Sequence, residues 1–263
     1  MLITSWRDFA EITVDTHDLD PMYDLIYGIR RRYGMPAAER YALHFFLFYD
    51  AGEAAGCMFS KVPFWTYIDN NYRTCRRGTE RRHFRGDNGS RAIAILRTIG
   101  EPRDVWGTLY RPNYDEFVHN VNTNFKGCQI GPYFMWKAMD IFDRCLGQPM
   151  ELYHRTAAKY MPEEPLKCAK AVWPDSPAMF SLERVVTAIA HLTAPGEPNR
   201  ACSYPEAETV LCMMKGYFIT KTHTVGDDVA EKHRQLKDYP LLTEILPKQQ
   251  DWKQYVRGAL DPS

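Results

Sequence analysis

The sequence lacks the cysteine spacing of a metal or disulfide site. Its seven cysteines are scattered, and no two of them form a CxxC or CxxxxC pair. An odd number at irregular spacing argues against a disulfide framework, a zinc knuckle and an iron–sulfur cluster. Free thiols are typical of a reducing compartment, so we expect the protein to reside in the cytoplasm.

The chain also lacks an excess of charge and a long apolar run. Its 33 basic and 33 acidic residues cancel, so any affinity for nucleic acid must come from a local patch. The longest apolar stretches, such as Phe45–Tyr49, are much shorter than a membrane span. The segment Met1–Asp8 lacks the apolar run that is typical of a signal peptide. We therefore expect no membrane partner.

A βαβ alternation, an internal repeat and a glycine-rich phosphate loop are absent as well. Apolar residues recur instead at helical spacing, and 45% of the chain is hydrophobic, which is enough for a substantial core. The sequence predicts an all-α fold. Its length suits one mostly helical domain over 1–263, with the option of two lobes, about 1–110 and 111–240, that meet at a cleft and a C-terminal extension, 240–263.

Prolines, glycines and capping residues set the expected helix bounds. Asn88 is expected to cap one helix and Gly216 to close another, while Ser203 and Glu206 form a capping-box pattern. The segments 162–177 and 194–201 read as connections. The expected helices cover 20–32, 37–51, 64–75, 89–99, 112–122, 131–146, 178–192, 204–215 and 227–237.

The most informative local pattern is a turn that leads into a helix. Gly127 and Gly131 flank Ile130, which we expect to anchor the turn in the core. Backbone N–H groups at the start of the helix, helped by its dipole, can hold one DNA phosphate without reading base sequence. The alternative is an ordinary helix–helix turn in which glycine supplies positive φ. The DNA-binding candidates are Lys126, Gly127, Gln129, Gly131 and Tyr133.

Arginine is concentrated between residues 73 and 97. Eight arginines there face only two carboxylates, Glu80 and Asp87, in a chain of zero net charge. The arginine fork binds phosphate oxygens through two hydrogen bonds, which favours a site for DNA phosphate or for a pyrophosphate. A solvated helix face with structural ion pairs is the alternative. The eight are Arg73, Arg76, Arg77, Arg81, Arg82, Arg85, Arg91 and Arg97.

Two helices carry polar residues at helical spacing. Glu208 and Lys215 share one face of the 204–215 helix with Cys212. Lys137, Asp140 and Arg144 form a stripe on the 131–146 helix opposite its apolar side. Both patterns also fit surface ion pairs. Their functional reading is a site in which the two helices face each other across a cleft.

The turn and the helix after it resemble the helix–hairpin–helix of base-excision DNA glycosylases. In those enzymes a catalytic aspartate follows, a few residues past the Leu-Gly that matches Leu146-Gly147. This chain has His154 near that position and no aspartate. The resemblance keeps the glycosylase-like scaffold and puts glycosylase chemistry in doubt.

Three separated blocks resemble a phage family, the α-glutamyl/putrescinyl-thymine pyrophosphorylases, also described as amino-acid:DNA transferases. The first block is Glu80–Gly86. The second joins Ile130–Pro132 to Trp136–Asp140 and Arg144, and the third is Glu206–Lys215. The blocks span roughly residues 60 to 230, and their joint order carries the resemblance.

The resemblance implies a reaction on 5-hydroxymethyluracil in phage DNA that already carries a pyrophosphate ester. An amino acid or a polyamine displaces the pyrophosphate from the 5-methylene carbon. The expected proton acceptor is Glu208 or Asp140, with Lys137 in the catalytic group. No metal site is expected, and Mg²⁺ is a candidate cofactor. The candidates for binding substrate or pyrophosphate are Arg81, Arg82, His83, Arg85 and Lys215, with Lys137 also a candidate for the leaving group.

Two other functions stay open from the sequence. A DNA glycosylase would use the same scaffold but would release a base. A non-catalytic DNA-binding accessory protein would need the turn and the arginines, and would leave the Glu208 and Asp140 faces as surface.

Overall fold

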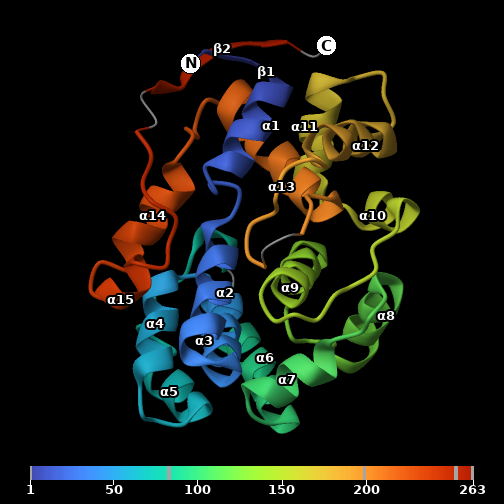
Figure 1. Ribbon diagram of the computed structural model, residues 1–263. Helices are drawn as coiled ribbons and strands as arrows, with labels where there is room; N and C mark the ends of the chain where they lie inside the picture. Colours follow the sequence, from blue (N-terminus) through green and yellow to red (C-terminus); the bar gives the residue numbers. More distant parts are fainter. Residues whose placement is uncertain (1, 82–83, 198–199, 252–253, 262–263) are drawn as a thin grey trace. The chain divides into compact units, whose positions relative to one another are not determined.

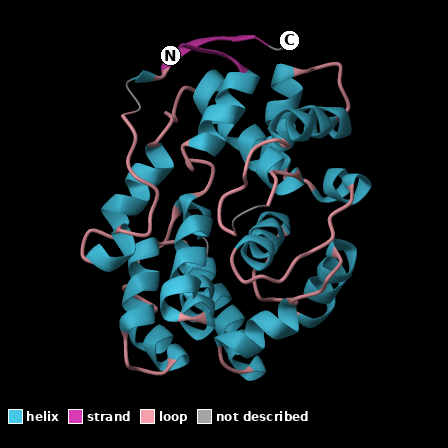
Figure 2. Cartoon of the chain, viewed as in Figure 1, coloured by secondary structure: helices cyan, strands magenta, loops and turns pink. Residues whose placement is uncertain are grey.

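The computed structural model is built almost wholly of helices, which confirms the predicted all-α class (Figures 1 and 2). It describes residues 2–81, 84–197, 200–251 and 254–261. The chain folds into two compact units that draw on alternating stretches of sequence. Unit 1 comprises residues 1–24, 152–233 and 246–263, and unit 2 comprises residues 25–151 and 234–245.

Unit 1 packs around α13, which contacts α11 and α12, while α1 lies against α12. Trp6 of α1 meets Trp173 edge to face, with ring centroids 5.4 Å apart. Strands β1 and β2 pair in parallel. The elements are β1 (Leu2–Ser5), α1 (Trp6–Asp15), the first turn of α2 (Pro21–Tyr33), α10 (His154–Tyr160), α11 (Glu163–Val172), α12 (Ala178–Ile189), α13 (Tyr204–Met214), the π-helical turn η2 (Lys215–Ile219), most of α14 (Asp227–Gln235) and β2 (Val256–Asp261).

Unit 2 is organised around α3, which contacts α4, α7 and α9 and is buried along most of its length. Four consecutive residues of α3, Phe45–Phe48, are each at most 3% exposed. The elements are the rest of α2, α3 (Met35–Phe48), α4 (Ala51–Phe59), α5 (Phe64–Asn71), the 3₁₀ turn η1 (Thr79–Arg81), α6 (Gly86–Ile99), α7 (Pro102–Leu109), α8 (Tyr114–Asn124), α9 (Pro132–Arg144) and α15 (Pro240–Thr243).

The expected helix over 37–51 is wrong, because two helices cover this stretch. Helix α3 ends at Phe48, since Tyr49 adopts a left-handed backbone with φ +57°. Asp50 then caps α4 by accepting a hydrogen bond from the Glu53 amide at 2.9 Å. A left-handed residue followed by an aspartate cap breaks a helix although the apolar pattern continues.

Several other expectations need correction. The 162–177 connection contains α11, whose first turn carries Glu163 and Glu164 where the helix dipole favours acidic residues. Asn88 lies inside α6, which begins at Gly86. Gly216 does not close α13, because the chain continues into the π-helical turn η2. The helix expected over 64–75 ends at Asn71.

Caps at other helix starts agree with the sequence. The Ser203 amide donates to the Glu206 carboxylate at 2.7 Å, as the capping box predicts. Helix α14 begins at Asp227, as expected. Helix α8, the turn after it and α9 form a continuous helix–turn–helix segment in which α8 packs against α9. Within the described part of the chain, no helix combines the length and the apolar character that crossing a membrane requires.

Candidate functional site

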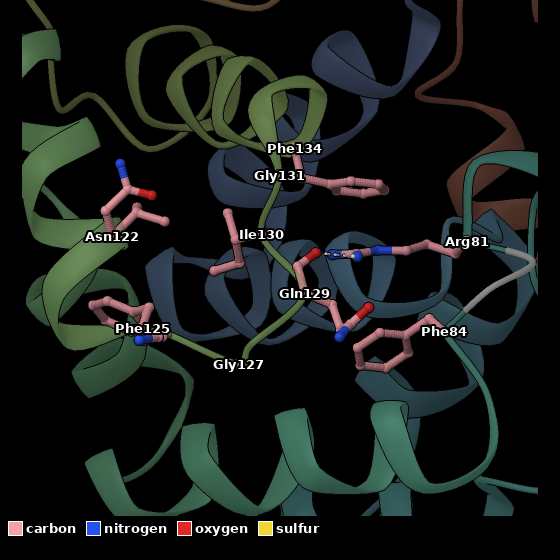
Figure 3. A pocket seen from close by; sticks show the side chains of 11 residues that line it. Arg81, Phe84, Asn122, Phe125, Gly127, Gln129, Ile130, Gly131 and Phe134 are labelled. Carbon is pink, nitrogen blue, oxygen red and sulfur yellow. Dashed lines mark hydrogen bonds between the residues drawn. The ribbon is translucent and has the colours of Figure 1, made fainter.

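A pocket opens in unit 2 at the turn between α8 and α9 (Figure 3). Its cavity volume is about 520 Å³. The apolar floor consists of buried side chains, which are Phe84, Val121, Phe125, Ile130 and Phe134. The rim is exposed and polar, and is formed by Asn122, Lys126 and Gln129. The expected anchor Ile130 is thus buried, at 8% exposure.

The turn itself carries two residues with positive φ. Gly127 has φ +91° and Gln129 has φ +58°. Gly131 has φ −85°, and a Cβ added there would meet no atom within 4 Å. Glycine at 131 is therefore required neither by backbone conformation nor by a protein neighbour, and it leaves open space at the start of α9.

Helix α9 begins without a side-chain cap. Gly131 is the N-cap residue and Pro132 follows at the first helical position. Because proline has no N–H, the first amide that donates along the helix is that of Met135, which bonds the Gly131 carbonyl at 2.9 Å. The helix dipole adds positive potential at this rim of the pocket.

Arg81 lies in the pocket floor and is only 3% exposed. Its Nε donates to the Phe46 carbonyl at 3.0 Å and its Nη1 donates to the Gln129 carbonyl at 2.9 Å. The guanidinium carbon lies 3.3 Å from the centroid of the Phe134 ring. Arg81 therefore ties the turn to the end of α3 and covers the first turn of α9.

The charge of Arg81 has no ionic partner in the part of the chain that the structure describes. Both of its acceptors are backbone carbonyls, and its Nη2 has no hydrogen-bond partner. Burial lowers the pKa of Arg81 to about 9, which still leaves it protonated at neutral pH. A buried, charged guanidinium without a carboxylate favours an anion close by.

The stripe on α9 is buried rather than solvated. Lys137 is 6% exposed, Asp140 1% and Arg144 0%. The Asp140 carboxylate lies 3.3 Å from Arg144 Nη2 and 3.9 Å from Lys137 Nζ. The Lys137 ammonium also lies 5.7 Å from the centroid of the Tyr133 ring, whose hydroxyl is 3.2 Å from that of Tyr49. Asp140 therefore lies between two buried cations on the same helix.

The candidate residues of α13 belong to unit 1, whereas those of α9 belong to unit 2. Glu208 is 2% exposed and accepts a hydrogen bond from the Thr209 hydroxyl at 3.3 Å. Lys215 stands at the end of α13 and pairs with Glu164 of α11. Lys215 is thus engaged in an ion pair at the surface, whereas Glu208 is a buried carboxylate.

Two transferases from phages are similar to this chain over most of its length. No protein-family model matches it. It is 29% identical to a putrescinyltransferase of Delftia phage PhiW-14 over 92% of this chain and 81% of that protein. It is 26% identical to a glycinyltransferase of Pseudomonas phage PaMx11 over 81% of this chain and 84% of that protein. The chain thus resembles two phage transferases over most of its length.

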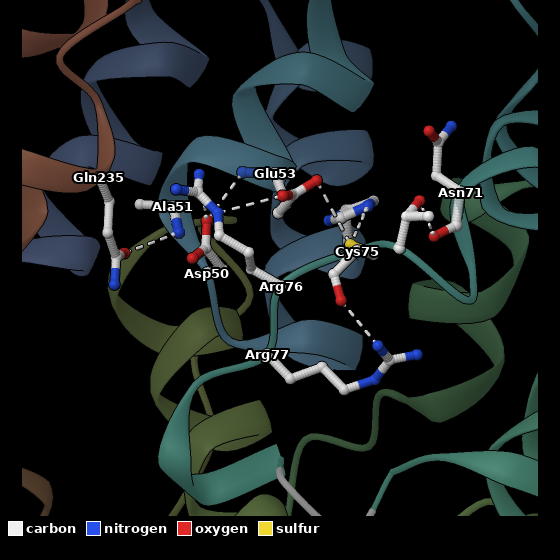
Figure 4. Close-up of polar contacts among 10 residues, drawn as sticks. Asp50, Ala51, Glu53, Asn71, Cys75, Arg76, Arg77 and Gln235 are labelled. Atoms are coloured by element: carbon white, nitrogen blue, oxygen red, sulfur yellow. Dashed lines mark hydrogen bonds and ion pairs between the residues drawn. The ribbon is translucent and has the colours of Figure 1, made fainter.

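Some arginines of the arginine-rich stretch hold other parts of the protein. Arg76 bridges Asp50 and Glu53 (Figure 4). Arg77 donates to three backbone carbonyls, including that of Cys75 at 2.7 Å. The alternative of structural ion pairs thus applies to part of the stretch.

The rest of the stretch is open to solvent. Arg85 precedes α6, and Arg73 and Arg91 are also exposed. Arg97 is exposed as well and pairs with Asp69. The expected ligands Arg82 and His83 lie outside the described residues. Arg91 stands one turn before Ile95, which is the nearest neighbour of Gly127, so it lies on the face of α6 nearest the turn.

A second polar cluster, in unit 1, was not predicted as a unit from the sequence. Asp18 is fully buried and accepts hydrogen bonds from the amides of Gly226, Asp228 and Val229 at 2.7 to 3.1 Å. It thereby caps α14 from a distant part of the chain. His223 Nε2 lies 3.5 Å from the same carboxylate.

This cluster shifts the titration of its members. Burial and the neighbouring Asp18 carboxylate raise the pKa of Asp228 to about 7. The pKa of His223 is raised, because its carboxylate neighbours outweigh the effect of burial. The structure gives these residues a role in fixing α14, and the signal that could have indicated it was the adjacent pair Asp227-Asp228 at a helix start.

No metal centre is evident among the described residues, where no three His, Cys, Asp or Glu side chains converge in a way that would hold an ion. The buried pair Cys75 and His44 does not provide a nucleophile either. Their Sγ and Nε2 atoms are 3.9 Å apart. Burial raises the pKa of the Cys75 thiol and lowers the pKa of His44 to about 3, so both are neutral at physiological pH.

Proposed function

We propose that this protein transfers an amino acid or a polyamine to a modified thymine base in phage DNA. The observation that carries the proposal is its similarity, over most of its length, to a putrescinyltransferase and a glycinyltransferase from phages. The pocket at the α8–α9 turn supports it, because the start of a helix, which suits a phosphate, adjoins a buried cation there.

The reaction we propose is a displacement at the 5-methylene carbon of pyrophosphorylated 5-hydroxymethyluracil. The amine nitrogen forms a bond to that carbon, the carbon–oxygen bond breaks, and pyrophosphate departs with the bonding electrons. The amine loses one proton to a carboxylate, for which Glu208 is the first candidate and Asp140 the second. Both are buried, which suits a proton acceptor shielded from water.

The leaving pyrophosphate needs cationic groups near it. Arg85 is exposed and available for this role, and Lys137 is a buried cation on the helix that starts at the turn. Arg81 contributes its positive charge, while its Nε and Nη1 donate to backbone carbonyls. Mg²⁺ is a candidate companion of the pyrophosphate, and no step above depends on it.

DNA is held, in this proposal, on the backbone of the turn. Lys126 supplies a charge at the rim and the amides at the start of α9 supply hydrogen bonds to a phosphate. Lys126 and Gly131 are both exposed, as a backbone contact requires. These contacts are independent of base sequence, so they position the strand rather than select a base.

The test is mass spectrometry of nucleosides after the protein is incubated with pyrophosphorylated hydroxymethyl-deoxyuridine DNA and a mixture of amino acids and putrescine. We expect a modified thymidine that carries the transferred amine. Glu208→Gln should lower the rate at least about 100-fold, as loss of a general base does. Glu163→Gln, at a carboxylate that is 79% exposed on α11, should leave it unchanged.

Two outcomes would contradict the proposal. Release of a free base instead of a modified nucleoside would indicate a glycosylase, and no change in the DNA would indicate a binding protein. Full transfer by both Glu208→Gln and Asp140→Asn would remove the proton-acceptor assignment while leaving the transferase in place.

A further inference from the structure

The pocket beneath the α8–α9 turn is larger than a phosphate site needs. A phosphate held on the helix amides and Lys126 would occupy the rim alone. The cavity of about 520 Å³ extends below that rim to a floor of buried apolar side chains. Three of these are aromatic rings, Phe84, Phe125 and Phe134, and they are 2%, 2% and 7% exposed.

We propose that this pocket takes one unstacked nucleotide of the DNA strand, with its base against the aromatic floor and its phosphate at the rim. The inference rests on the proposed function in that the ligand is DNA. The inference goes beyond the proposed function, which assigns only backbone contacts to the turn, because it places an unstacked base there.

The floor provides what a planar base needs. Aromatic faces and edges stack with bases of any sequence, and such stacking is a large part of single-strand affinity. Figure 3 shows Phe84 and Phe125 on either side of the turn residues Gly127 and Gln129, with Phe134 above them. The rings come from three separate segments of the chain, so the folded unit assembles an aromatic surface that no single segment has.

The rim provides hydrogen bonds for the edge of a base. Asn122 and Gln129 both line the pocket, are exposed and end in amide groups. An amide has both a donor and an acceptor, as does the pairing edge of a pyrimidine such as thymine. Two such groups at the mouth of an apolar pocket are typical of sites that orient a small polar ring.

The charge of the site favours an anionic ligand. Arg81 lines the same cavity and is only 3% exposed. Its Nη2 has no hydrogen-bond partner. No carboxylate of the described residues neutralises it. Lys126 adds a second positive charge at the rim. A nucleotide suits this pocket, because its planar base can lie on the aromatic floor and its negative phosphate lies at the rim near Lys126.

The opening at Gly131 gives such a ligand room to approach. A Cβ at this position would meet no protein atom within 4 Å, although Gly131 lines the pocket. Space next to the uncapped amides of α9 allows a phosphate to come within hydrogen-bond distance of the backbone.

The experiment measures binding of the full chain to two fluorescent oligonucleotides by anisotropy. One is a single-stranded pentathymidylate, and the other is the same strand with an abasic central nucleotide. We expect the wild type to bind the first about tenfold more tightly, which corresponds to the stacking of one base.

Asn122→Trp places a large ring at the mouth of the pocket and should abolish this preference. Thr123→Trp is the matched control, since Thr123 is the exposed neighbour that does not line the pocket, and it should keep the preference. Lys126→Ala should weaken binding of both strands by a similar factor. Circular dichroism melting curves establish that all three variants are folded.

Equal binding of the two strands by the wild type would overturn the inference, and so would an equal effect of the two tryptophan variants. The transfer assay separates this failure from failure of the proposed function. Transfer without base discrimination would reject the base pocket alone. Base discrimination without transfer would retain the pocket and reject the transferase.

Discussion

Arg81 Nη1 donates a 2.9 Å hydrogen bond to the carbonyl of Gln129, a residue held at φ +58°. The same guanidinium donates through Nε to the carbonyl of Phe46 in α3. One side chain thus fixes a turn with positive φ to the largely buried helix α3. A turn fixed in this way keeps its amides in place before a ligand arrives, which lowers the entropic cost of binding.

Arg81→Lys is expected to destabilise unit 2 by about 1 to 3 kcal/mol, since lysine cannot reach both carbonyls with a fixed fork and leaves a buried acceptor unsatisfied. Urea unfolding followed by circular dichroism measures the change. Arg85→Lys is the control, because Arg85 is exposed, and its free energy of unfolding should stay within about 0.5 kcal/mol of the wild type. Equal stability of the two variants would show that the fork does not fix the turn.

Gly131→Ala and Gly127→Ala should behave in opposite ways. Alanine at 131 fits φ −85° and meets no neighbour, so the fold should keep its stability while DNA binding weakens. Alanine at 127 must adopt φ +91° and comes within 3.2 Å of Ile95 Cδ1, so it should destabilise the fold by about 1 kcal/mol or more. Thermal melts and anisotropy with duplex DNA measure both effects. Unchanged DNA affinity in folded Gly131→Ala would argue against a phosphate at the start of α9.

Asp140→Asn should be strongly destabilising. The substitution removes the negative charge that lies between Lys137 and Arg144, both of which are buried. Breaking a buried ion pair from one side costs about 3 to 5 kcal/mol. Lys167→Met removes two exposed ion pairs on α11 and should change the stability far less. Chemical denaturation measures the difference, and a loss of similar size in the two variants would contradict the buried cluster.

Stability should fall as the pH rises through about 7, because of the Asp18 cluster. The pKa of Asp228 is raised from 3.8 to about 7 in the folded chain, so the folded state binds the proton more tightly. The stability from this group is fully present below about pH 4 and is lost as the pH approaches and passes 7. His223 acts in the same direction, since its pKa is raised above 6.5.

Asp228→Asn isolates this effect. Asparagine keeps the size of the side chain and cannot ionise, so its melting temperature should decline less than that of the wild type between pH 5.5 and pH 8. Differential scanning calorimetry at both pH values gives the comparison. The same decline in both proteins would mean that Asp228 does not titrate in this range.

The sequence by itself determined the helical class, several caps and the importance of the turn. Helical periodicity and the Ser203–Glu206 capping box are local signals, because they act between residues a few positions apart. The exposed Lys126 and Gly131 and the buried Ile130 also follow from the local pattern of the turn. Local patterns missed the break at Tyr49, since a left-handed residue leaves no apolar signature.

Only the tertiary structure decided which candidates share a site. It brought Arg81 to Gln129, 48 residues away, and showed that Arg76 and Arg77 are engaged in ion pairs and backbone hydrogen bonds. The structure shows that Lys137, Asp140 and Arg144 are buried. Their spacing in the sequence also fitted a row of solvated ion pairs on the helix surface. Burial and long-range pairing depend on how separate helices pack, and a linear pattern of charges does not contain that information.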